Sequence, residues 1–331
     1  MPSRALSSQE IDTLGRHLGP AILRALGDPD VTEISVNDDL VIWVDGPAGY
    51  VRAEDVYSGL PARASAEGLN KFGRLIAAQL DEVLTGTSPS LSAELAWTDL
   101  DLRLQIFRPP ITAEHHTLIL RKLAARFYPL AGTPDAYLER GILDEAQLQT
   151  IRAAIDERLN ILVVGGMASG KTTFANALLG EISERTPSHR VILLQDTREL
   201  RCMAPNFLDL RTTPSVSLRD LTKMALRTGG DRVVVGEIRD EAALDLLDIW
   251  LTGHTGGLAT FHADSAQVAL RRLDGLCRRL SASSQAETIA EAVGLVVVLK
   301  KAPPPLRRRV VSVQRVVGWK EGRFLLGSGD S

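Results

Sequence analysis

One eight-residue stretch, Gly165-Gly166-Met167-Ala168-Ser169-Gly170-Lys171-Thr172, constrains the fold of this chain more than any other feature of its sequence. It has the spacing G-x-x-x-x-G-K-T, follows an apolar run at 161–164, and precedes a stretch that is compatible with a helix. In this pattern backbone N–H groups converge on phosphate oxygens, the lysine neutralises the β and γ oxygens, and the threonine hydroxyl ligates Mg²⁺. The sequence therefore predicts a strand, a nucleotide-binding loop and a helix in that order, with Thr173 as a further nucleotide contact.

The remainder of the chain after residue 143 repeats this texture of apolar strand, glycine-rich turn and helix. Such alternation predicts a mostly parallel sheet that is covered on both faces, in which sites form at the carboxyl ends of the strands. A second strand at 191–194 leads into a segment that contains Asp196 and Glu199. Either acid could reach Mg²⁺ or the attacking water, although such an acidic cluster, taken alone, is more often a solvated loop.

Two further strand ends carry candidate groups. The strand at 232–235 is followed by Gly236 and Glu237, and a carboxylate there can orient and deprotonate water or hold Mg²⁺ through water. The strand at 258–261 ends at His262 and is preceded by a glycine-rich loop with His254. A single histidine is usually structural, but two at such positions indicate a pair that senses whether the γ-phosphate is present.

The first part of the chain has a different pattern. Helical spacing of apolar residues predicts helices at 8–26 and 66–84, and alternation predicts short strands at 34–36, 41–44, 102–106 and 118–121. Residues 126–142 contain several prolines and glycines and few apolar positions, which is typical of a linker. The predicted domains are therefore an α+β domain over 1–125, a linker over 126–142 and an α/β domain over 143–331.

Composition excludes several classes of protein. The net charge of −3 and the 5% of aromatic residues give little support to direct DNA binding. Two separated cysteines indicate neither a disulfide framework nor a zinc site, as expected of a cytosolic protein. The chain shows no leader pattern and no run of about 18 apolar residues that would span a membrane. Residues 307–309 form a basic run before a last hairpin over 310–317 and 323–326, and such a run is more often a solvated turn.

The four segments, in this order and spacing, resemble the secretion ATPase superfamily, whose members carry a Walker A loop, an Asp box, a Walker B segment with glutamate, and a His box. The resemblance is strong over about 140–300, and residues 26–37 and 103–110 are similar to the family's N-terminal domain. Among its branches the chain looks most like the conjugal-transfer type.

The resemblance implies a RecA-like P-loop motor domain preceded by a smaller α+β domain. It also implies that ATP, with Mg²⁺, binds between these two domains. It also implies a homohexameric ring in the cytoplasm, peripheral to the inner membrane, that works on the membrane components of a secretion or conjugation machine. The function that the resemblance implies is ATP hydrolysis that powers conjugative transfer or type IV secretion.

The roles of individual residues also come from the resemblance. Lys171 and Thr172 would bind phosphate and Mg²⁺, Glu199 would be the Asp-box acid, Glu237 the catalytic carboxylate and His262 the main His-box residue. Asp196 would hold Mg²⁺ directly or through water. Further nucleotide contacts or charge-stabilising groups would be Arg103, Arg121, Arg227, Arg239 and His254. Gln195 stands where many relatives have glutamate, which raises the weight on Glu199.

Several alternatives stay open. A pilus or type II secretion motor is disfavoured by the absence of a tetracysteine module and of an Ala-Ile-Arg-Asn-Leu-like end. A nucleotide-gated assembly platform with little turnover would not need Glu199, Glu237 and His262 together. A DNA-translocating motor would need a basic channel or stacking aromatics, and a metabolic kinase would need a lid for its acceptor substrate.

Overall fold

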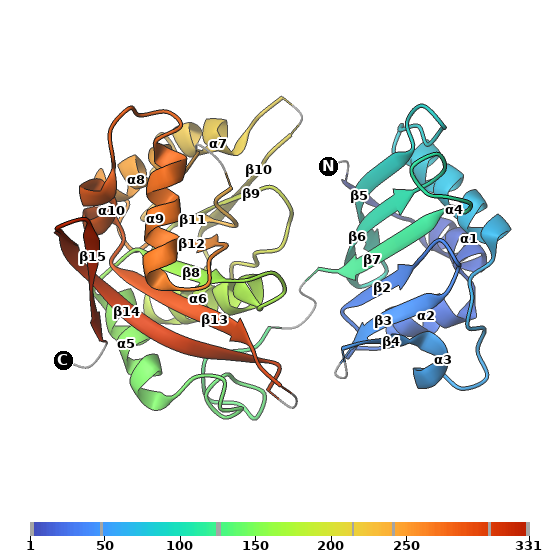
Figure 1. Cartoon of the computed structure of the whole chain (residues 1–331), viewed down its shortest axis with the longest axis horizontal. Coiled ribbons are helices and arrows are strands. Elements are labelled where there is room, and N and C mark those ends of the chain that lie inside the picture. The colour runs from blue at the N-terminus through green and yellow to red at the C-terminus, as the bar shows by residue number, and fades with distance from the viewer. Residues whose placement is uncertain are drawn as a thin grey trace. The chain divides into compact units, whose positions relative to one another are not determined.

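The computed structural model describes residues 3–46, 49–123, 127–213, 215–239, 242–303 and 306–328. The chain divides into two compact units, Met1–Ala125 and Arg126–Ser331, and Figure 1 labels the elements of each. Arg126, the first residue of the predicted linker, and residues 304 and 305, next to the predicted basic run, lie outside the described residues.

The first unit is built on a seven-stranded sheet with the order β1-β5-β6-β7-β2-β3-β4. All neighbouring strands are antiparallel except β1, which runs parallel to β5. Its strands are β1 (Ser3–Ala5), β2 (Glu33–Val36), β3 (Ile42–Gly46), β4 (Gly49–Arg52), β5 (Ser90–Trp97), β6 (Leu100–Phe107) and β7 (Thr117–Lys122). Its helices are α1 (Ser8–Leu18), α2 (Pro20–Gly27), α3 (Ala53–Val56) and α4 (Ala66–Gln79).

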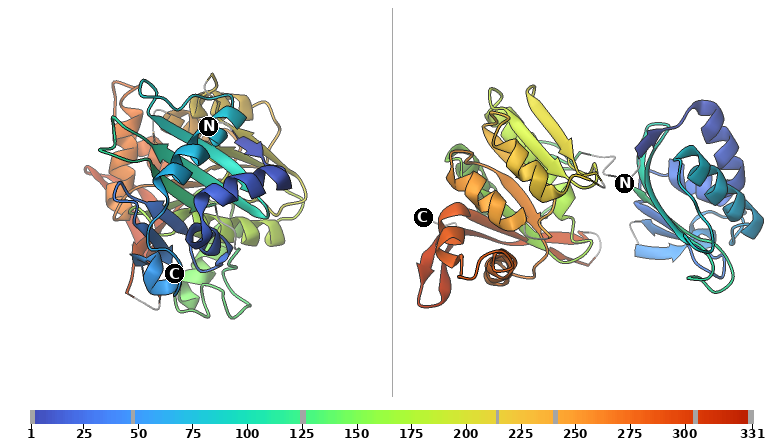
Figure 2. Two further views of the ribbon diagram at one scale, coloured as in Figure 1. Left: turned by 90° about the vertical axis from the view of Figure 1, so that its right-hand side faces the viewer. Right: turned by 90° about the horizontal axis from the view of Figure 1, so that it is seen from above.

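One face of this sheet is packed against helices. In β6, Leu102, Leu104 and Ile106 are buried while the residues between them are half-exposed, so the period of two places every second side chain in the core. The helices α1, α2 and α4 supply the other half of that core, and Figure 2 shows them on one face of the sheet. The region predicted as one helix over 8–26 forms two, because Gly19 adopts a positive φ of 83° and Pro20 starts a new helix.

The second unit contains an eight-stranded sheet with the order β10-β9-β11-β12-β8-β13-β14-β15. The first six strands in that order are parallel, and β14 and β15 add an antiparallel edge. Its strands are β8 (Ile161–Gly165), β9 (Val191–Gln195), β10 (Phe207–Arg211), β11 (Arg232–Val235), β12 (Leu258–Phe261), β13 (Leu295–Lys301), β14 (Arg308–Lys320) and β15 (Arg323–Ser328). Its helices are α5 (Glu145–Asp156), α6 (Lys171–Arg185), α7 (Leu218–Ala225), α8 (Ala242–Leu251), α9 (Ala266–Cys277) and α10 (Ala286–Ala292).

Helices cover both faces of this second sheet. In β8, Leu162 and Val164 face a core that α7, α8, α9 and α10 complete, whereas Ile161 and Val163 face α5 and α6. A strand buried on both sides has to be apolar throughout, as the run at 161–164 is. The predicted α/β class, with a smaller α+β unit before it, is confirmed. The parallel strands all end at one edge of the sheet, where Lys171, Glu237 and His262 lie.

The segment predicted as a linker packs with the second unit. Leu130, Tyr137, Ile142 and Leu143 are buried in the core on the α5–α6 side, and the Tyr137 ring stands edge-on to Phe174 at a centroid distance of 5.1 Å. Although prolines and glycines punctuate this stretch, its few apolar side chains are the ones that are buried. By its packing, residues 128–143 are therefore part of the second unit rather than a separate linker.

The helices are short compared with a membrane span. A spanning helix needs about 20 mostly apolar residues, and α6, with 15 residues, contains lysine, glutamate and arginine. Within the described ranges, no helix has the length and apolar composition needed to cross a bilayer.

Candidate active site

The loop between β8 and α6 has the geometry of a phosphate cradle. Gly170, the residue before α6, adopts a left-handed conformation with φ of 89°, which a residue with a side chain rarely takes. A Cβ atom at Gly165 would lie only 2.6 Å from the carbonyl oxygen of Leu299, so the start of the loop also excludes a side chain. No side chain caps the N-terminus of α6. The N–H groups of its first turn are therefore available to an anion.

Lys171 turns its ammonium group back over this loop. Its side chain is buried, and Nζ donates to the carbonyl oxygen of Gly166 at 3.1 Å. The same Nζ lies 3.2 Å from Nδ1 of His262, which is the first residue after β12. The lysine begins the helix that follows β8 and the histidine follows the neighbouring strand β12, so the two side chains meet above the loop.

His262 bridges Lys171 and Glu237. A lysine ammonium can only donate, so Nδ1 of the ring accepts and the proton of the neutral ring is on Nε2. Nε2 lies 2.7 Å from Oε1 of Glu237, a buried oxygen with no aligned hydrogen-bond donor in the described part of the chain. Burial, and after it the Lys171 charge, holds the pKa of His262 below its usual range, while Glu237 acts in the opposite direction. The ring is therefore neutral at neutral pH.

Glu237 is held from its other side by Arg239. Nε of Arg239 donates to Oε2 of Glu237 at 2.8 Å, and its Nη2 contacts the same oxygen. Nη1 of Arg239 lies 3.7 Å from Oδ2 of Asp196, at the end of β9. These contacts form one chain of polar and charged side chains that runs past the ends of β8, β12, β11 and β9. Asp196, predicted to hold Mg²⁺, is the outermost member, with its side chain 38% exposed.

The segment after β9 is fixed by two buried amides. Oε1 of Gln195 accepts from the backbone N–H groups of Glu199 and Leu200, at 3.2 and 3.0 Å. Asn176 of α6 donates to the carbonyl oxygen of Glu199 at 3.0 Å. Gln195 thus shapes the loop rather than serving as an acid, as expected from the departure at this position.

This segment places a carboxylate against the predicted Mg²⁺ ligand. The Thr172 hydroxyl donates to Oε2 of Glu199 at 3.1 Å. In nucleotide sites Mg²⁺ typically uses one or two protein oxygens together with phosphate oxygens. Thr172 and Glu199 fit that requirement, and the described residues contain no cluster of three or more acids, histidines or cysteines that would form an all-protein metal site. The buried Ser169 Oγ, which has no partner among the described residues, adds an unsatisfied polar atom to the loop.

Other predicted residues lie apart from this chain of contacts. Arg227 is exposed in the turn after α7, and Nδ1 of His254 is buried without a hydrogen-bond partner in the described ranges. Arg103 on β6 and Arg121 on β7 lie directly opposite each other in the sheet of the first unit. Their contact with nucleotide, and that of Arg227 and His254, stays a prediction.

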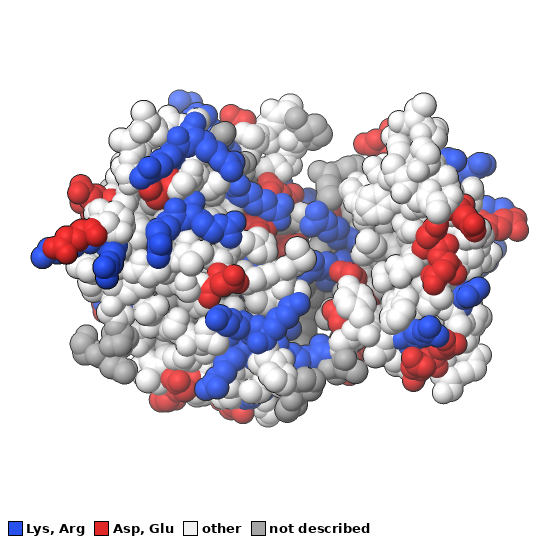
Figure 3. Space-filling view, in the orientation of Figure 1, with Lys and Arg blue, Asp and Glu red and all other residues white. Residues whose placement is uncertain are grey.

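Arg308 is a candidate that sequence reasoning missed. It was counted only as part of a solvated basic run, and Figure 3 shows lysines and arginines gathered near the end of β13 and the start of β14. However, a Cβ atom at Gly170 would lie 2.5 Å from Nη1 of Arg308 and 3.0 Å from its Cδ. The guanidinium therefore lies directly against the phosphate-binding loop. The triple-arginine run was a signal for positive charge, but nothing in it distinguished Arg308 from its two neighbours.

Together these groups can carry out hydrolysis of a phosphoanhydride. The loop and Lys171 supply N–H groups and positive charge for phosphates, Thr172 and Glu199 supply oxygens for Mg²⁺, and Glu237 is a carboxylate next to a neutral imidazole. A carboxylate at that edge can orient water and accept its proton.

Comparisons with known proteins agree with this geometry. The profile of the family described as "Type II/IV secretion system protein" matches residues 89–320. The "Probable conjugal transfer protein TrbB" of Sinorhizobium fredii is 39% identical and aligns with 94% of this chain and 91% of its own. The "Type IV secretion system protein PtlH" of Bordetella pertussis is 32% identical, with 87% and 91% covered.

A solved structure shows the same fold. The ATPase DotB of Legionella pneumophila superposes with a TM-score of 0.63 at 17% identity, over 97% of this chain and 86% of that protein. Because the family profile covers well over half of the chain and both relatives exceed 30% identity along most of it, the chain belongs to the family of type II/IV secretion system proteins.

Proposed function

We propose that this chain hydrolyses ATP and thereby powers conjugative transfer or type IV secretion. The observation that carries the proposal is the line Lys171–His262–Glu237, which joins the phosphate-binding loop to a carboxylate through a neutral ring, with contacts of 3.2 and 2.7 Å. A chain that only bound nucleotide would have no need of a carboxylate in this place. The names of the relatives, a conjugal transfer protein and a type IV secretion protein, support the machine on which the motor acts.

In the proposed reaction, water attacks the γ-phosphorus and ADP leaves with the β-phosphate oxygen. Glu237 takes the proton of the attacking water, and Lys171 and the N–H groups at the start of α6 hold the phosphate oxygens. Mg²⁺ bound by Thr172 and Glu199 would supply further charge neutralisation. Arg239 orients the Glu237 carboxylate, because its guanidinium donates to one carboxylate oxygen and leaves the other facing His262.

His262 would report the state of the loop to Glu237. In this structure Lys171 is directed toward His262 and the Gly166 carbonyl. A phosphate group in the loop competes for the same ammonium group, so Lys171 leaves Nδ1 when nucleotide binds. The ring, released on one side, is then free to reorient or to bind a proton, and the environment of Glu237 changes with it.

The assembly and location are part of the same proposal. We place the chain in a homohexameric ring at the cytoplasmic face of the inner membrane, in contact with membrane components of the secretion or conjugation machine. Arg103, Arg121, Arg227 and Arg239 would stabilise the charge that develops on the nucleotide.

The test is ATP turnover of the purified chain, measured together with its mass by light scattering with and without ATP and Mg²⁺. We expect Lys171→Ala to lower turnover by about a thousandfold or more, because the loop loses its only described buried ammonium, whereas Lys223→Ala on α7 leaves turnover unchanged. Lys171-dependent turnover by a particle of about six subunits supports the proposal.

Two outcomes contradict it. Turnover by a stable monomer would indicate a different nucleotide hydrolase. ATP binding without turnover in every state, including the assembled ring, would favour the nucleotide-gated platform instead.

A further inference from the structure

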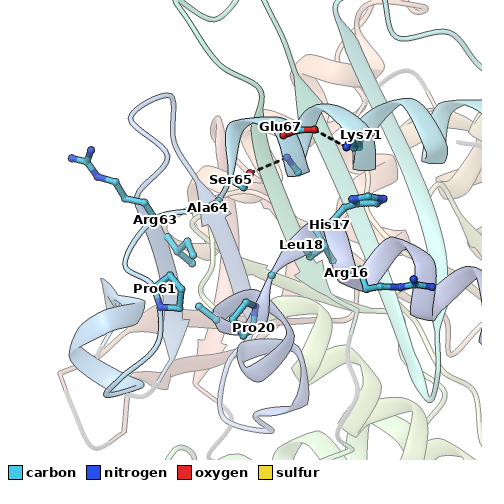
Figure 4. A pocket seen from close by; sticks show the side chains of 14 residues that line it. Arg16, His17, Leu18, Pro20, Pro61, Arg63, Ala64, Ser65, Glu67 and Lys71 are labelled. Atoms are coloured by element: carbon cyan, nitrogen blue, oxygen red, sulfur yellow. Dashed lines mark hydrogen bonds and ion pairs between the residues drawn. The ribbon is translucent and has the colours of Figure 1, made fainter.

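The first two turns of α4, in the first unit, separate two hollows in the protein surface. One, of about 310 Å³, lies between the end of α1, the Gly19-Pro20 turn and residues 61–68, and is shown in Figure 4. The other, of about 540 Å³, lies between α4 and the segment that joins β6 to β7. We call it the α4 hollow and define it by Lys71, Arg74, Arg108, Glu114, His115 and His116. Glu67 and Lys71 line both hollows.

Positive charge in the α4 hollow is not balanced by carboxylates. Lys71 is paired with Glu67 at 2.6 Å, as Figure 4 shows, and His115 lies 3.9 Å from Glu114. Only the Lys71–Glu67 contact joins two groups of opposite charge at neutral pH, because a histidine is charged only when it is protonated. Arg74 and Arg108 have no carboxylate partner among the described residues. Beyond the Lys71–Glu67 pair, the hollow therefore has two guanidinium groups and one carboxylate, that of Glu114, and keeps a net positive charge.

The guanidinium group of Arg108 is held in place by one hydrogen bond and has one N–H group without an acceptor among the described residues. Its Nη1 donates to the carbonyl oxygen of Leu84 at 3.1 Å, which fixes the plane of the guanidinium. Its Nε is buried and has no acceptor within the described ranges. A buried charged N–H group without an acceptor is unfavourable, so the first unit leaves the charge of Arg108 only partly compensated.

The wall opposite α4 is held in place by Asp38. Its carboxylate accepts from the backbone N–H groups of His115 and Glu114, at 2.8 and 3.2 Å, so the segment carrying these residues is fixed. His116, next to them, is only 7% exposed. Burial, and then Arg108 and Arg74, holds its pKa below the usual range. It therefore offers a neutral ring that can share in hydrogen bonding within a positive environment.

We propose that the α4 hollow binds a phosphate group, carried either by a small phosphate ester or by a lipid headgroup. Guanidinium groups bind phosphate oxygens through paired N–H donors, and Arg74, Arg108 and Lys71 converge on the hollow from α4 and from the end of β6. A volume of about 540 Å³ exceeds that of a phosphate ion, which leaves room for the group that the phosphate carries.

Histidine ring resonances of the full chain report binding directly. The chain has six histidines, two of which line the hollow. Inorganic phosphate is titrated into the Lys171→Ala variant, so that the phosphate-binding loop of the second unit does not contribute. We expect saturable shifts of the His115 and His116 resonances, and Arg74→Ala should weaken binding about tenfold or more, because an exposed guanidinium is lost without a change in the core.

The matched control is Arg63→Ala. It removes the same charge from the same unit, but Arg63 lines only the first hollow and points away from α4 in Figure 4. Phosphate affinity should be unchanged in this variant. Shifts that grow linearly with phosphate, or equal weakening by Arg63→Ala and Arg74→Ala, would mean that phosphate only screens surface charge, and the proposal would be overturned.

A second arm distinguishes the source of the phosphate. Full-length protein is sedimented with phosphatidylcholine vesicles that contain or lack phosphatidylglycerol. Arg74-dependent binding to the anionic vesicles alone assigns the hollow to a lipid headgroup. Saturable phosphate binding without vesicle binding assigns it to a small phosphate ester. If neither probe binds in an Arg74-dependent manner, the hollow is not a phosphate site.

Discussion

His262 at the phosphate-binding loop and His116 in the α4 hollow both lie among positive charges, but only His262 has a carboxylate against it. Lys171 and Arg239 near His262 are balanced by Glu237 and Asp196. Around His116, the neighbouring Arg108, Arg74 and His115 all act to lower its pKa, and no acid opposes them.

The difference indicates two kinds of binding site. At the loop, acids and bases are already paired within the unit, so an incoming phosphate has to rearrange existing contacts. That rearrangement is what couples binding to chemistry. In the hollow, an incoming anion compensates a net positive charge. Binding there needs no rearrangement of existing ion pairs and produces no reaction. Removing or adding a carboxylate, or changing a cation, in either site therefore tests this contrast.

The largest effect is expected from Glu237→Gln, which makes the loop site resemble the hollow. Loss of the carboxylate removes the group that accepts the proton of water, and we expect kcat for ATP to fall by about 100- to 10,000-fold. Nucleotide affinity should be retained, because the phosphate-binding groups are untouched. Turnover and equilibrium binding of ATP, measured on the same preparation, check both parts.

The same variant should lower the pKa of His262 further, since Glu237 is the group that raises it. Glu291→Gln, an exposed change on α10, is the matched control. Unchanged turnover in Glu237→Gln would remove Glu237 from the proposed mechanism and leave the loop site as a binding site only.

The reverse change places a carboxylate in the hollow. Asn70 lines the hollow from α4, and Asn70→Asp adds one negative charge with almost no change in size. We expect phosphate binding there to weaken about tenfold, and the pKa of His116 to rise, since an acid now opposes Arg74 and Arg108. Gln9→Glu adds the same charge at the start of α1 and should change neither quantity. Equal phosphate affinity in Asn70→Asp and the wild type would contradict the contrast.

Much of the fold could be predicted from periodicity. The run at 161–164 is apolar throughout because β8 is buried on both faces, and the alternation at 102–106 reflects a sheet with one covered face. β5 (Ser90–Trp97) was missed because its serines, alanines and glutamate have low strand propensity, although it is buried along most of its length. The stretch over 126–142 was predicted to be a linker because its sequence does not show that Leu130 and Tyr137 are buried, which depends on tertiary packing.

The candidate site shows the same division. Residues that follow strands could be predicted, because parallel strands end at one edge, and Glu199, Glu237 and His262 do lie there. Contacts between residues far apart in sequence could not. Asn176 holds the Glu199 loop from within a helix, and Arg308 reaches Gly170 from another strand. The α4 hollow depends on the same kind of contact, since Arg74 and Arg108 come from different elements.

A smaller effect is expected from Arg308→Ala. The guanidinium against Gly170 adds positive charge to the loop, but it is half-exposed, so its contribution is screened by solvent. We expect KM for ATP to rise about two- to fivefold with little change in kcat. Arg309→Ala, the exposed neighbour on the same strand, should leave KM unchanged. A lower KM in Arg308→Ala would mean that Arg308 obstructs the loop instead of assisting it.

The smallest effect concerns the dependence of stability on pH, and it compares the two histidines directly. Both have a pKa below the usual value of 6.5, mainly because of burial, so below that pH the unfolded chain binds more protons than the folded one. Stability is therefore full above about pH 6.5 and is lost as the pH falls toward the folded-state pKa values. The side chain of His262 is 42% exposed and screened by water, whereas His116 is only 7% exposed. His116→Gln should thus reduce the drop in Tm between pH 8 and pH 5.5 more than His262→Gln does, as measured by thermal denaturation.

Adding phosphate should reduce the wild-type drop as well, because an anion beside Arg74 and Arg108 favours the protonated ring in the folded state. Equal drops in all three proteins would show that neither histidine contributes to the pH dependence of stability, and would contradict the difference in burial between the hollow and the loop.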